Sequence, residues 1–357
     1  MNLNVQENVS LAEFTTLKIG GKARFFVSAQ NETEVVEALK FAEKNAFDVF
    51  ILGGGSNVLI ADEGFDGLVL QIALKGVSTF PKKGETIYVT ANAGEDWDEF
   101  VAFCVEKNLA GIECLSGIPG FVGGTPVQNV GAYGQEVSET IRSVKCFDRN
   151  AKKMIELTNS ECGFAYRTSI FNTTRKNRFV VLAVTYALEL NGEPKIVYRD
   201  LQNYFIGRNP SLQETRCGVI DIRSTKSMVI NETDANSKSA GSFFKNPIVN
   251  LNKFAEIEQI AKKMNLEEVP SFCIDAGNIK IPAAWLIEKS GFYKGFQSGR
   301  VGLSTKHTLA IVNLGNATAS DVIRFKEEIQ MKVKQKFGVA LQPEPIFIGF
   351  KNNQERG

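Results

Sequence analysis

Apolar residues recur every three to four positions in several stretches of the chain, which is the spacing of one buried helix face. Asn31 precedes the first stretch, with Glu34 three residues later as in a capping box. Ser320 or Asp321 begins the last stretch, and Gly338 ends it. The spacing predicts helices over residues 31–45, 96–108, 211–226, 254–264 and 283–288, and a longer one that ends at 338.

Short apolar runs bounded by turn residues predict strands. They lie at residues 47–52, 58–60, 68–72, 87–91, 144–147, 154–157, 179–190 and 346–350. Asp148-Arg149-Asn150 is a polar hairpin turn between two of these strands. Helices and strands follow one another without a regular βαβ alternation, so the pattern favours an α+β fold.

One stretch, Gly111 to Gly134, cannot belong to a helix or a central strand. It holds seven glycines, with Pro119 and Pro126 between them. Ordering so flexible a segment is useful where its backbone must approach a ligand, and N–H groups in tight turns bind anions. The stretch is therefore either a site for a phosphate-bearing or flat cofactor or an ordinary glycine-rich surface loop.

A second glycine cluster, Gly53-Gly54-Gly55-Ser56-Asn57, follows the strand predicted at 47–52. A Rossmann site needs a helix after the glycines, but the run at 58–60 is short and β-like. The cluster suits a pyrophosphate bound by a strand-to-strand loop. The alternative is a glycine-rich turn in a small sheet.

Three polar side chains stand in suggestive surroundings. Arg167, amid apolar and aromatic neighbours, is either a carboxylate or phosphate clamp or a surface arginine whose stem covers apolar area. Ser242 lies in the segment 241–247 with a lysine and an amide; its ordinary interpretation is a cap or turn. Glu344 lies between two prolines, which restrict its backbone; either this helps to orient its carboxylate, or the residue only marks a turn.

Composition excludes several function classes. The length of 357 residues suggests two or three domains, and 43% hydrophobic with 23% charged residues is typical of a soluble globular protein. Because 41 basic residues nearly balance 40 acidic ones, no nucleic-acid surface is expected. The N-terminus has no secretory-signal pattern, and no apolar run reaches the ~20 residues of a membrane span, so we expect a cytoplasmic protein.

Metal and disulfide chemistry are not expected. The six cysteines are scattered and never form a C-x-x-C pair, so they are interpreted as reduced thiols, mostly in the core. They are Cys104, Cys114, Cys146, Cys162, Cys217 and Cys273. With His307 as the single histidine, a multi-histidine metal centre is impossible. Residues 304–307 either touch a ligand or pack beside a strand, and we favour packing.

Taken together, the chain closely resembles the UDP-N-acetylenolpyruvoylglucosamine reductases, in particular their first type. The resemblance rests on motifs that occur in the family's order over nearly the whole chain. They are GGGSNVL at 53–59, IPGFVGGTPVQNVGAYG at 118–134, YRTSIF at 166–171, GSFFKNP at 241–247 and QPEPIFIG at 342–349.

The resemblance implies an α+β fold of the PCMH or vanillyl-alcohol-oxidase-like flavin type, with two FAD-binding subdomains and a C-terminal α+β substrate-binding domain. Residues 1–74 would form the first subdomain, to which a final strand at 339–351 would return. Residues 75–226 would form the second, with a tyrosine-bearing insertion near 193–210. Residues 227–338 would form the substrate domain.

The implied activity is reduction of the enolpyruvyl ether of UDP-N-acetylglucosamine to UDP-N-acetylmuramate, in peptidoglycan precursor synthesis. The resemblance implies non-covalent FAD as cofactor and NADPH as co-substrate, which delivers a hydride to the flavin. A monomer without a metal, a nucleic-acid partner or a membrane span is expected.

The family match also implies residue roles. Arg167 would face the substrate carboxylate, Ser242 would donate a proton, and Glu344 would be a second acidic or hydrogen-bonding partner. FAD would be bound by Gly53, Gly54, Gly55, Ser56, Asn57, Val58, Ile118, Pro119, Gly120, Gly123, Gly124, Thr125, Gln128, Asn129 and Gly131. The substrate would be bound by Tyr133, Tyr198, Lys226, Lys245 and Asn246.

Two alternatives remain at this point. A flavin oxidase of the same broad fold would regenerate FAD with oxygen and often tethers the flavin through histidine or cysteine. A sugar-nucleotide or flavin-binding module without turnover would not need Arg167, Ser242 and Glu344 together.

Overall fold

The computed structural model describes residues 3–81, 84–266 and 268–350. Their contacts divide the chain into two compact units. The first unit comprises the described residues of 3–9, 23–55 and 66–229, and the second those of 10–22, 56–65 and 230–350.

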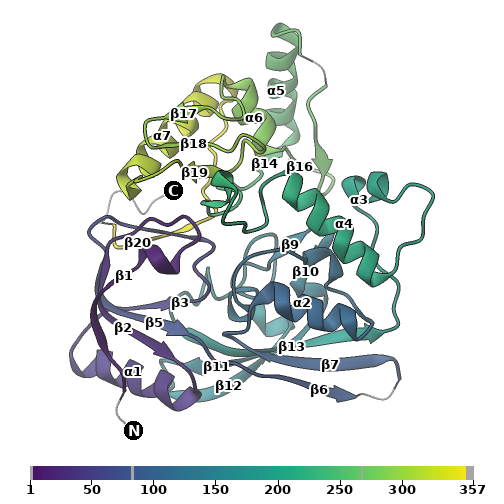
Figure 1. The fold of residues 1–357 in the computed structure, drawn as a ribbon. Helices are drawn as coiled ribbons and strands as arrows, with labels where there is room; N and C mark the ends of the chain where they lie inside the picture. Colours follow the sequence, from purple (N-terminus) through teal and green to yellow (C-terminus); the bar gives the residue numbers. More distant parts are fainter. Residues whose placement is uncertain (1–2, 82–83, 267, 351–357) are drawn as a thin grey trace. The chain divides into compact units, whose positions relative to one another are not determined.

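The first unit contains a six-stranded sheet in the order β12-β11-β13-β7-β6, with β8 on β13 (Figure 1). Neighbouring strands are antiparallel throughout. The strands are β6 (Val77–Pro81), β7 (Thr86–Asn92), β8 (Leu109–Ala110), β11 (Ile141–Asp148), β12 (Lys153–Thr158) and β13 (Phe179–Leu190). The central strand β13 is buried over its first six residues, 179–184, whereas its last two residues, Glu189 and Leu190, are exposed.

Helix α2 (Trp97–Glu106) packs on this sheet through aromatic side chains. Asp96 caps the helix by accepting hydrogen bonds from the amides of Asp98 and Glu99. The rings of Trp97 and Phe100 lie 5.8 and 5.2 Å from the buried ring of Tyr186. The helix is therefore positioned on the sheet by the apolar face that its sequence spacing indicated.

A smaller sheet of the first unit has the order β1-β2-β5-β3. Its strands are β1 (Gln6–Ser10), β2 (Lys22–Ala29), β3 (Val49–Leu52) and β5 (Phe65–Ile72). Helix α1 (Glu32–Lys44) joins β2 to β3, and its cap is Asn31, whose side chain accepts from the Glu34 amide. Strand β3, parallel to β5, ends directly before Gly53.

Two further helices of the first unit are α3 (Arg199–Tyr204), within the expected insertion at 193–210, and α4 (Leu212–Thr225). Ser211 and Glu214 form a capping box at the start of α4. Leu201 and Phe205 pack with Val219 in a small apolar cluster. The insertion is thus attached to α4 by buried side chains. The unit also contains β9 (Gly131–Ala132) and β10 (Gln135–Glu136).

The described residues of the second unit form two three-stranded sheets, a two-stranded sheet and three helices. The strands of the unit's three-stranded sheets are β14 (Ile248–Asn250), β15 (Phe272–Cys273), β16 (Asn278–Lys280), β17 (Gln297–Ser298), β18 (Val301–Leu303) and β19 (Ile311–Asn313). Its helices are α5 (Leu251–Lys263), α6 (Ala283–Lys289) and α7 (Ala319–Phe337). Short 3₁₀ turns lie in the first unit at 113–115, 122–124, 137–139 and 160–162, and in the second unit at 12–14 and 235–237.

Strand β4 (Val58–Ile60) belongs to the second unit, where it pairs in parallel with β20 (Ile346–Ile348). The final strand therefore returns to a segment close to the N-terminus. The boundaries at 74, 226 and 338 stay predictions. Within the predicted ranges, residues 1–2, 82–83, 267 and 351 lie outside the described part of the chain.

The helices predicted from apolar spacing all form, with one correction at a cap. Helix α7 is capped by Thr318, in a capping box with Asp321, and not by Ser320 or Asp321. Thr318 carries the hydroxyl that reaches the amide three residues ahead, whereas Ser320 lies inside the first turn. Gly338 ends the helix with φ of 64°, as expected.

Candidate active site

Two glycine loops of the first unit meet backbone to backbone. A Cβ atom added at Gly54 would lie 2.7 Å from the Cα of Gly120 and 3.0 Å from the amide nitrogen of Phe121. Only glycine permits so close an approach. The tertiary structure therefore joins the two glycine motifs, which stand far apart in the sequence, into one backbone surface.

The loop around Gly120 is fixed to the sheet and to α2 by main-chain hydrogen bonds. The Trp97 amide donates to the carbonyl of Gly120 at 2.9 Å, and the Gly123 amide donates to the carbonyl of Ala93 at 2.9 Å. A Cβ at Gly123 would lie 2.6 Å from that of Ala93. These hydrogen bonds and the close packing fix the backbone of the loop against the rest of the unit.

This surface has the features that a phosphate-bearing cofactor requires. A Cβ at Gly53 or Gly124 would meet no heavy atom within 4 Å, so each of these glycines has an open side where a Cβ would project. Glycine amides without side chains allow a ligand to approach the backbone. The residues present therefore fit FAD. Ile118, Pro119, Gln128 and Gly131, also predicted to bind it, are half-buried on the same stretch.

Two predicted FAD-binding side chains are engaged within the protein. The Thr125 hydroxyl is 2.8 Å from the Val122 carbonyl oxygen and 2.8 Å from the Tyr186 hydroxyl. The Asn129 amide donates to Glu136 at 2.7 Å, and its oxygen accepts from the Ser138 amide at 3.1 Å. These side chains hold the shape of the loop.

The other predicted FAD-binding residues near position 53 are divided between the units. Gly55 ends a segment of the first unit, whereas Ser56, Asn57 and Val58 begin a segment of the second. Asn57 binds the chain at Glu344: its side-chain amide donates to the Glu344 carbonyl at 3.3 Å. Asn57 thus fixes the main chain at one of the predicted catalytic residues.

Arg167 reaches the glycine-rich stretch of the first unit. Its Nη2 donates to the carbonyl oxygen of Gly131 at 2.7 Å, and its guanidinium lies 5.4 Å from the ring centre of Tyr166. The residue is half-buried and has φ of 56°, a conformation that non-glycine residues seldom adopt and that is common at functional sites. The structure therefore holds this cation in a defined position.

Tyr133, Tyr198 and Lys226 also gather in the first unit. The two tyrosine rings make an edge-to-face contact at 5.5 Å, and the Lys226 Nζ lies 5.7 Å from the centre of the Tyr133 ring. Lys226 forms an ion pair with Asp200 at 2.7 Å. Three of the predicted substrate-binding residues are thus neighbours.

Sequence reasoning missed Arg223 at this cluster. Its side chain is buried, its Nη2 donates to the Met228 carbonyl at 2.7 Å, and its Nε has no hydrogen-bond partner among the described residues. Burial lowers the pKa of Arg223, and burial raises the pKa of Tyr133, which Arg223 contacts. The available signal was helical spacing, since Arg223 precedes Lys226 by three residues.

Ser242, Lys245 and Glu344 come together in the second unit. The Glu344 amide donates to the Phe243 carbonyl at 2.9 Å, and the Lys245 amide donates to the Gln342 carbonyl at 2.9 Å. These bonds make an antiparallel pair of segments, anchored by the buried rings of Phe243 and Phe244. The motifs at 241–247 and 342–349 therefore present Ser242 and Glu344 from facing segments.

Asn246 has a structural task in the same unit. Its side-chain oxygen accepts from the Ala283 amide at 2.9 Å, at the beginning of α6. An amide side chain can still donate through its nitrogen while its oxygen is engaged. Asn246 thus fixes α6 through its oxygen, and its nitrogen can still donate in the predicted role in substrate binding.

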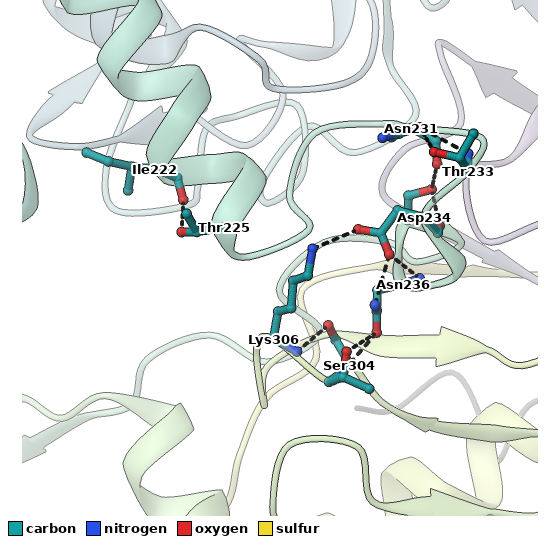
Figure 2. Close-up of polar contacts among 10 residues, drawn as sticks. Ile222, Thr225, Asn231, Thr233, Asp234, Asn236, Ser304 and Lys306 are labelled. Atoms are coloured by element: carbon teal, nitrogen blue, oxygen red, sulfur yellow. Dashed lines mark hydrogen bonds and ion pairs between the residues drawn. The ribbon is translucent and has the colours of Figure 1, made fainter.

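The segment 304–307 packs against the loop at 231–237, as Figure 2 shows. Lys306 forms a 3.5 Å ion pair with Asp234, and the Thr305 amide donates to Asn236 at 2.8 Å. His307 accepts a hydrogen bond from the Leu309 amide through Nδ1. These contacts agree with the packing interpretation of the segment.

In the described part of the chain, no cluster of histidine, cysteine, aspartate or glutamate could hold a metal ion. No helix there has the length and apolarity that crossing a bilayer demands. All six cysteines are free, and Cys104, Cys114, Cys146 and Cys162 are buried. Burial raises the pKa of the Cys162 thiol to about 12, so that thiol stays protonated.

Comparisons with known proteins decide the family. Residues 23–155 match the model of an FAD binding domain, and residues 232–348 match the C-terminal domain of UDP-N-acetylenolpyruvoylglucosamine reductase. The reductase of Thermobifida fusca is 41% identical over 98% of this chain and 99% of its own length. The chain belongs to the UDP-N-acetylenolpyruvoylglucosamine reductase family.

Other reductases agree. That of Streptomyces coelicolor is 41% identical over 97% of this chain and 91% of its own. The crystal structure of the Thermus caldophilus reductase covers 98% of this chain and 99% of its own, with a TM-score of 0.64 and 24% identity, which supports the shared fold.

Membership in this reductase family confirms the predicted fold class and the enzyme class. The chain is an FAD-dependent oxidoreductase with an FAD-binding fold followed by the reductase C-terminal domain. A binding module without turnover does not account for relatives that are reductases over the full chain.

Proposed function

We propose how the residues of this chain carry out the reaction of its family. The chain reduces the enolpyruvyl ether of UDP-N-acetylglucosamine to UDP-N-acetylmuramate, a peptidoglycan precursor, with NADPH as reductant and FAD as cofactor. The residue roles below are our proposal. The single observation that carries it is the backbone pairing of residues 243–245 with 342–344, which brings the main chain next to Ser242 and the main chain at Glu344 onto facing segments.

The joined glycine loops, residues 53–55 and 118–124, are proposed to hold FAD. The open sides of Gly53 and Gly124 and the close contact of Gly54 with Gly120 support this assignment. When bound, FAD would supply the hydride-transfer chemistry between NADPH and the methylene carbon of the substrate. The glycine loops contribute rigidity and a backbone surface.

Arg167 is proposed to stabilise the negative charge that moves toward the substrate carboxylate during reduction. A guanidinium has several N–H donors in one plane, so it can bind the Gly131 carbonyl and pair with a carboxylate as well. Its fixed position means that little reorganisation is needed as the charge grows.

Ser242 is proposed to donate the proton that completes the reduction, at the carbon next to the one that receives the hydride. An unassisted hydroxyl is a poor acid, so Lys245 or a water relay is assigned to support it. Glu344, on the facing segment, is assigned as the second acidic or hydrogen-bonding partner. The hydride and this proton together saturate the double bond.

The sugar nucleotide is proposed to contact a first set of residues, Tyr133, Tyr198 and Lys226, and a second set, Lys245 and Asn246. Lysine ammonium groups are suited to the negatively charged diphosphate, and tyrosine rings to the flat uracil. The neighbouring positions of Tyr133, Tyr198 and Lys226 support the first set.

Ser242→Ala tests the mechanism. NADPH should still reduce the flavin in this variant, while oxidation by the enolpyruvyl substrate should slow by roughly two to four orders of magnitude, the scale of a lost acid catalyst. Stopped-flow absorbance of the flavin separates the two half-reactions.

Ser290→Ala is the matched control, because Ser290 is a half-buried serine of the same unit whose buried hydroxyl has no partner among the described residues. Both half-reactions should run normally in it. A Ser242→Ala enzyme with two normal half-reactions would remove Ser242 from the mechanism.

We also propose that the enzyme acts as a monomer in the cytoplasm. The free thiols support a reducing compartment. Sedimentation equilibrium of the FAD-loaded protein should give the mass of one chain, 39.3 kDa plus FAD.

A further inference from the structure

The Lys226 ammonium, which the proposed function assigns to substrate binding, forms an ion pair with Asp200. Lys226 follows the last residue of α4, and Asp200 lies in the first turn of α3. The Lys226 Nζ is 2.7 Å from the Asp200 Oδ2, and both side chains are partly exposed, at 34% and 39%. A ligand arriving from solvent can therefore reach both partners.

Asp200 is also close to the tyrosine that is expected to contact the nucleotide. Tyr198 precedes it by two residues and caps α3, and the Tyr198 ring contacts Tyr133 edge to face. Burial raises the pKa of Tyr198, the nearby Asp200 charge raises it further, and the Lys226 charge lowers it. A charge change at Asp200 is thus felt at the segment that carries Tyr198.

An ammonium group at this position faces two anions of different strength. A diphosphate carries more negative charge and more acceptor oxygens than one carboxylate. However, the carboxylate is tethered to the protein and always present, so the diphosphate must displace it or share the ammonium with it. Like charges near one cation repel each other, and that repulsion weakens ligand binding.

We propose that Asp200 sets the affinity for the substrate's diphosphate by competing with it for the Lys226 ammonium. The proposal rests on the proposed function, because it assumes that Lys226 binds the diphosphate. Asp200 then acts as an affinity-determining residue: it neutralises Lys226 in the substrate-free enzyme and moderates how tightly substrate and product are held.

The anchoring of α3 allows Asp200 to be altered without detaching the helix. Leu201 and Phe205 remain buried against Val219, and the Tyr204 hydroxyl donates to Asp221 at 2.5 Å. Tyr204–Asp221 is a second polar link between α3 and α4. It provides matched controls, because it joins the same helices away from Lys226.

The test is calorimetric titration of the FAD-loaded enzyme with UDP. Asp200→Asn should bind UDP about two- to fivefold more tightly, the scale of one partly exposed ion pair. Asp221→Asn, which removes the same charge from the same pair of helices, should leave the dissociation constant unchanged. So should Tyr204→Phe, which removes the other polar link.

Lys226→Met separates failure of this proposal from failure of the proposed function. Weaker UDP binding in Lys226→Met supports Lys226 as a diphosphate ligand, and Asp200→Asn should then have no effect in the Lys226→Met background. If Lys226→Met binds UDP like the unaltered enzyme, the substrate assignment of Lys226 is wrong. Two results would overturn competition by Asp200 while leaving the assignment of Lys226 intact. In both, Lys226→Met weakens UDP binding; in the first, Asp200→Asn does not tighten UDP binding, and in the second, Asp221→Asn tightens it as much as Asp200→Asn does.

Discussion

Adding a Cβ atom would have opposite consequences at two glycines of the proposed FAD site. At Gly54 a Cβ would collide with the backbone of Gly120, whereas at Gly53 it would meet nothing within 4 Å. The first glycine is required by the fold of the protein itself. The second is compatible with a side chain in the FAD-free protein, so a requirement for glycine there would come from the ligand.

Gly54→Ala is therefore expected to destabilise the FAD-free protein by about 1–3 kcal/mol, the usual cost of forcing atoms into a packed site. Gly53→Ala, the neighbouring control, should change the free energy of unfolding by less than about 0.5 kcal/mol. Urea unfolding of both FAD-free variants measures the difference. Equal stability of the two variants would show that the contact between the loops is not tight.

Polar residues in the motifs also divide by task. Asn129, Thr125 and Asn246 were predicted as ligand-binding residues, yet their side-chain oxygens bind protein groups. A side chain that holds a loop can still contact a ligand through its other donors and acceptors, so the ligand roles of these residues stay predictions. Residue type and spacing do not separate the two tasks.

At the scale of elements, Asp148 links the end of strand β11 to the hairpin turn before β12 and to the residue just before β13. Asp148 ends β11, accepts from the amides of Asn150 and Ala151 in the hairpin turn, and pairs with Arg178 just before β13. The side chain is buried, and the Arg178 guanidinium lies 2.7 Å away. These hydrogen bonds, led by the one from Arg178, lower the pKa of Asp148 to about 2.

The stability of this turn should consequently depend on pH. Because the folded pKa is below the unfolded value near 4, the contribution of Asp148 is complete above pH ~4 and is lost as the pH falls toward 2. The unfolding free energy of the unaltered protein minus that of Asp148→Asn should be constant from pH 7 to 5 and shrink below 4. A difference that stays constant down to pH 3 would contradict the assignment.

Long elements were mostly predictable and many short ones were not, although the short strands β4 and β20 were predicted and the eight-residue strand β2 was missed. Helices α1, α2 and α4 and strand β13 have enough residues to display a buried face or a continuous apolar run. Strands β17 to β19 have only two or three residues each and show no period. They exist because partner strands supply their hydrogen bonds, which a local pattern does not reveal.

At the scale of the whole molecule, the second unit is assembled from three separate parts of the chain. Residues 10–22 and 56–65 join the C-terminal part, and Leu17 and Leu59 are fully buried in its core. Asp62 binds the first turn of α7: its carboxylate accepts from the amides of Ala319 at 2.6 Å and Ser320 at 3.0 Å. An N-terminal segment thus satisfies amides that a helix start leaves unpaired.

Asp62→Ala is expected to lower the free energy of unfolding by about 1–2 kcal/mol, the cost of losing a helix cap. Asp66→Ala is the control, because Asp66 pairs with Arg24 where both side chains are largely exposed, and such pairs contribute at most about 1 kcal/mol. Thermal unfolding measures the stability of both variants, and hydrogen exchange measures the protection of the α7 amides in each. Faster exchange at the start of α7 in Asp66→Ala than in Asp62→Ala would refute the capping role.

The amino-acid sequence alone determined the long helices, the α+β class, the reductase family and hence FAD and the reaction. These follow from local periodicity and from motifs that are contiguous in the chain, so they can be read without knowing which segments meet. Only the tertiary structure decided that Gly54 lies on Gly120, that Asp62 caps α7, and that Lys226 faces Asp200. Each of these is a contact between residues distant in the sequence, and such contacts leave no periodic or local signal.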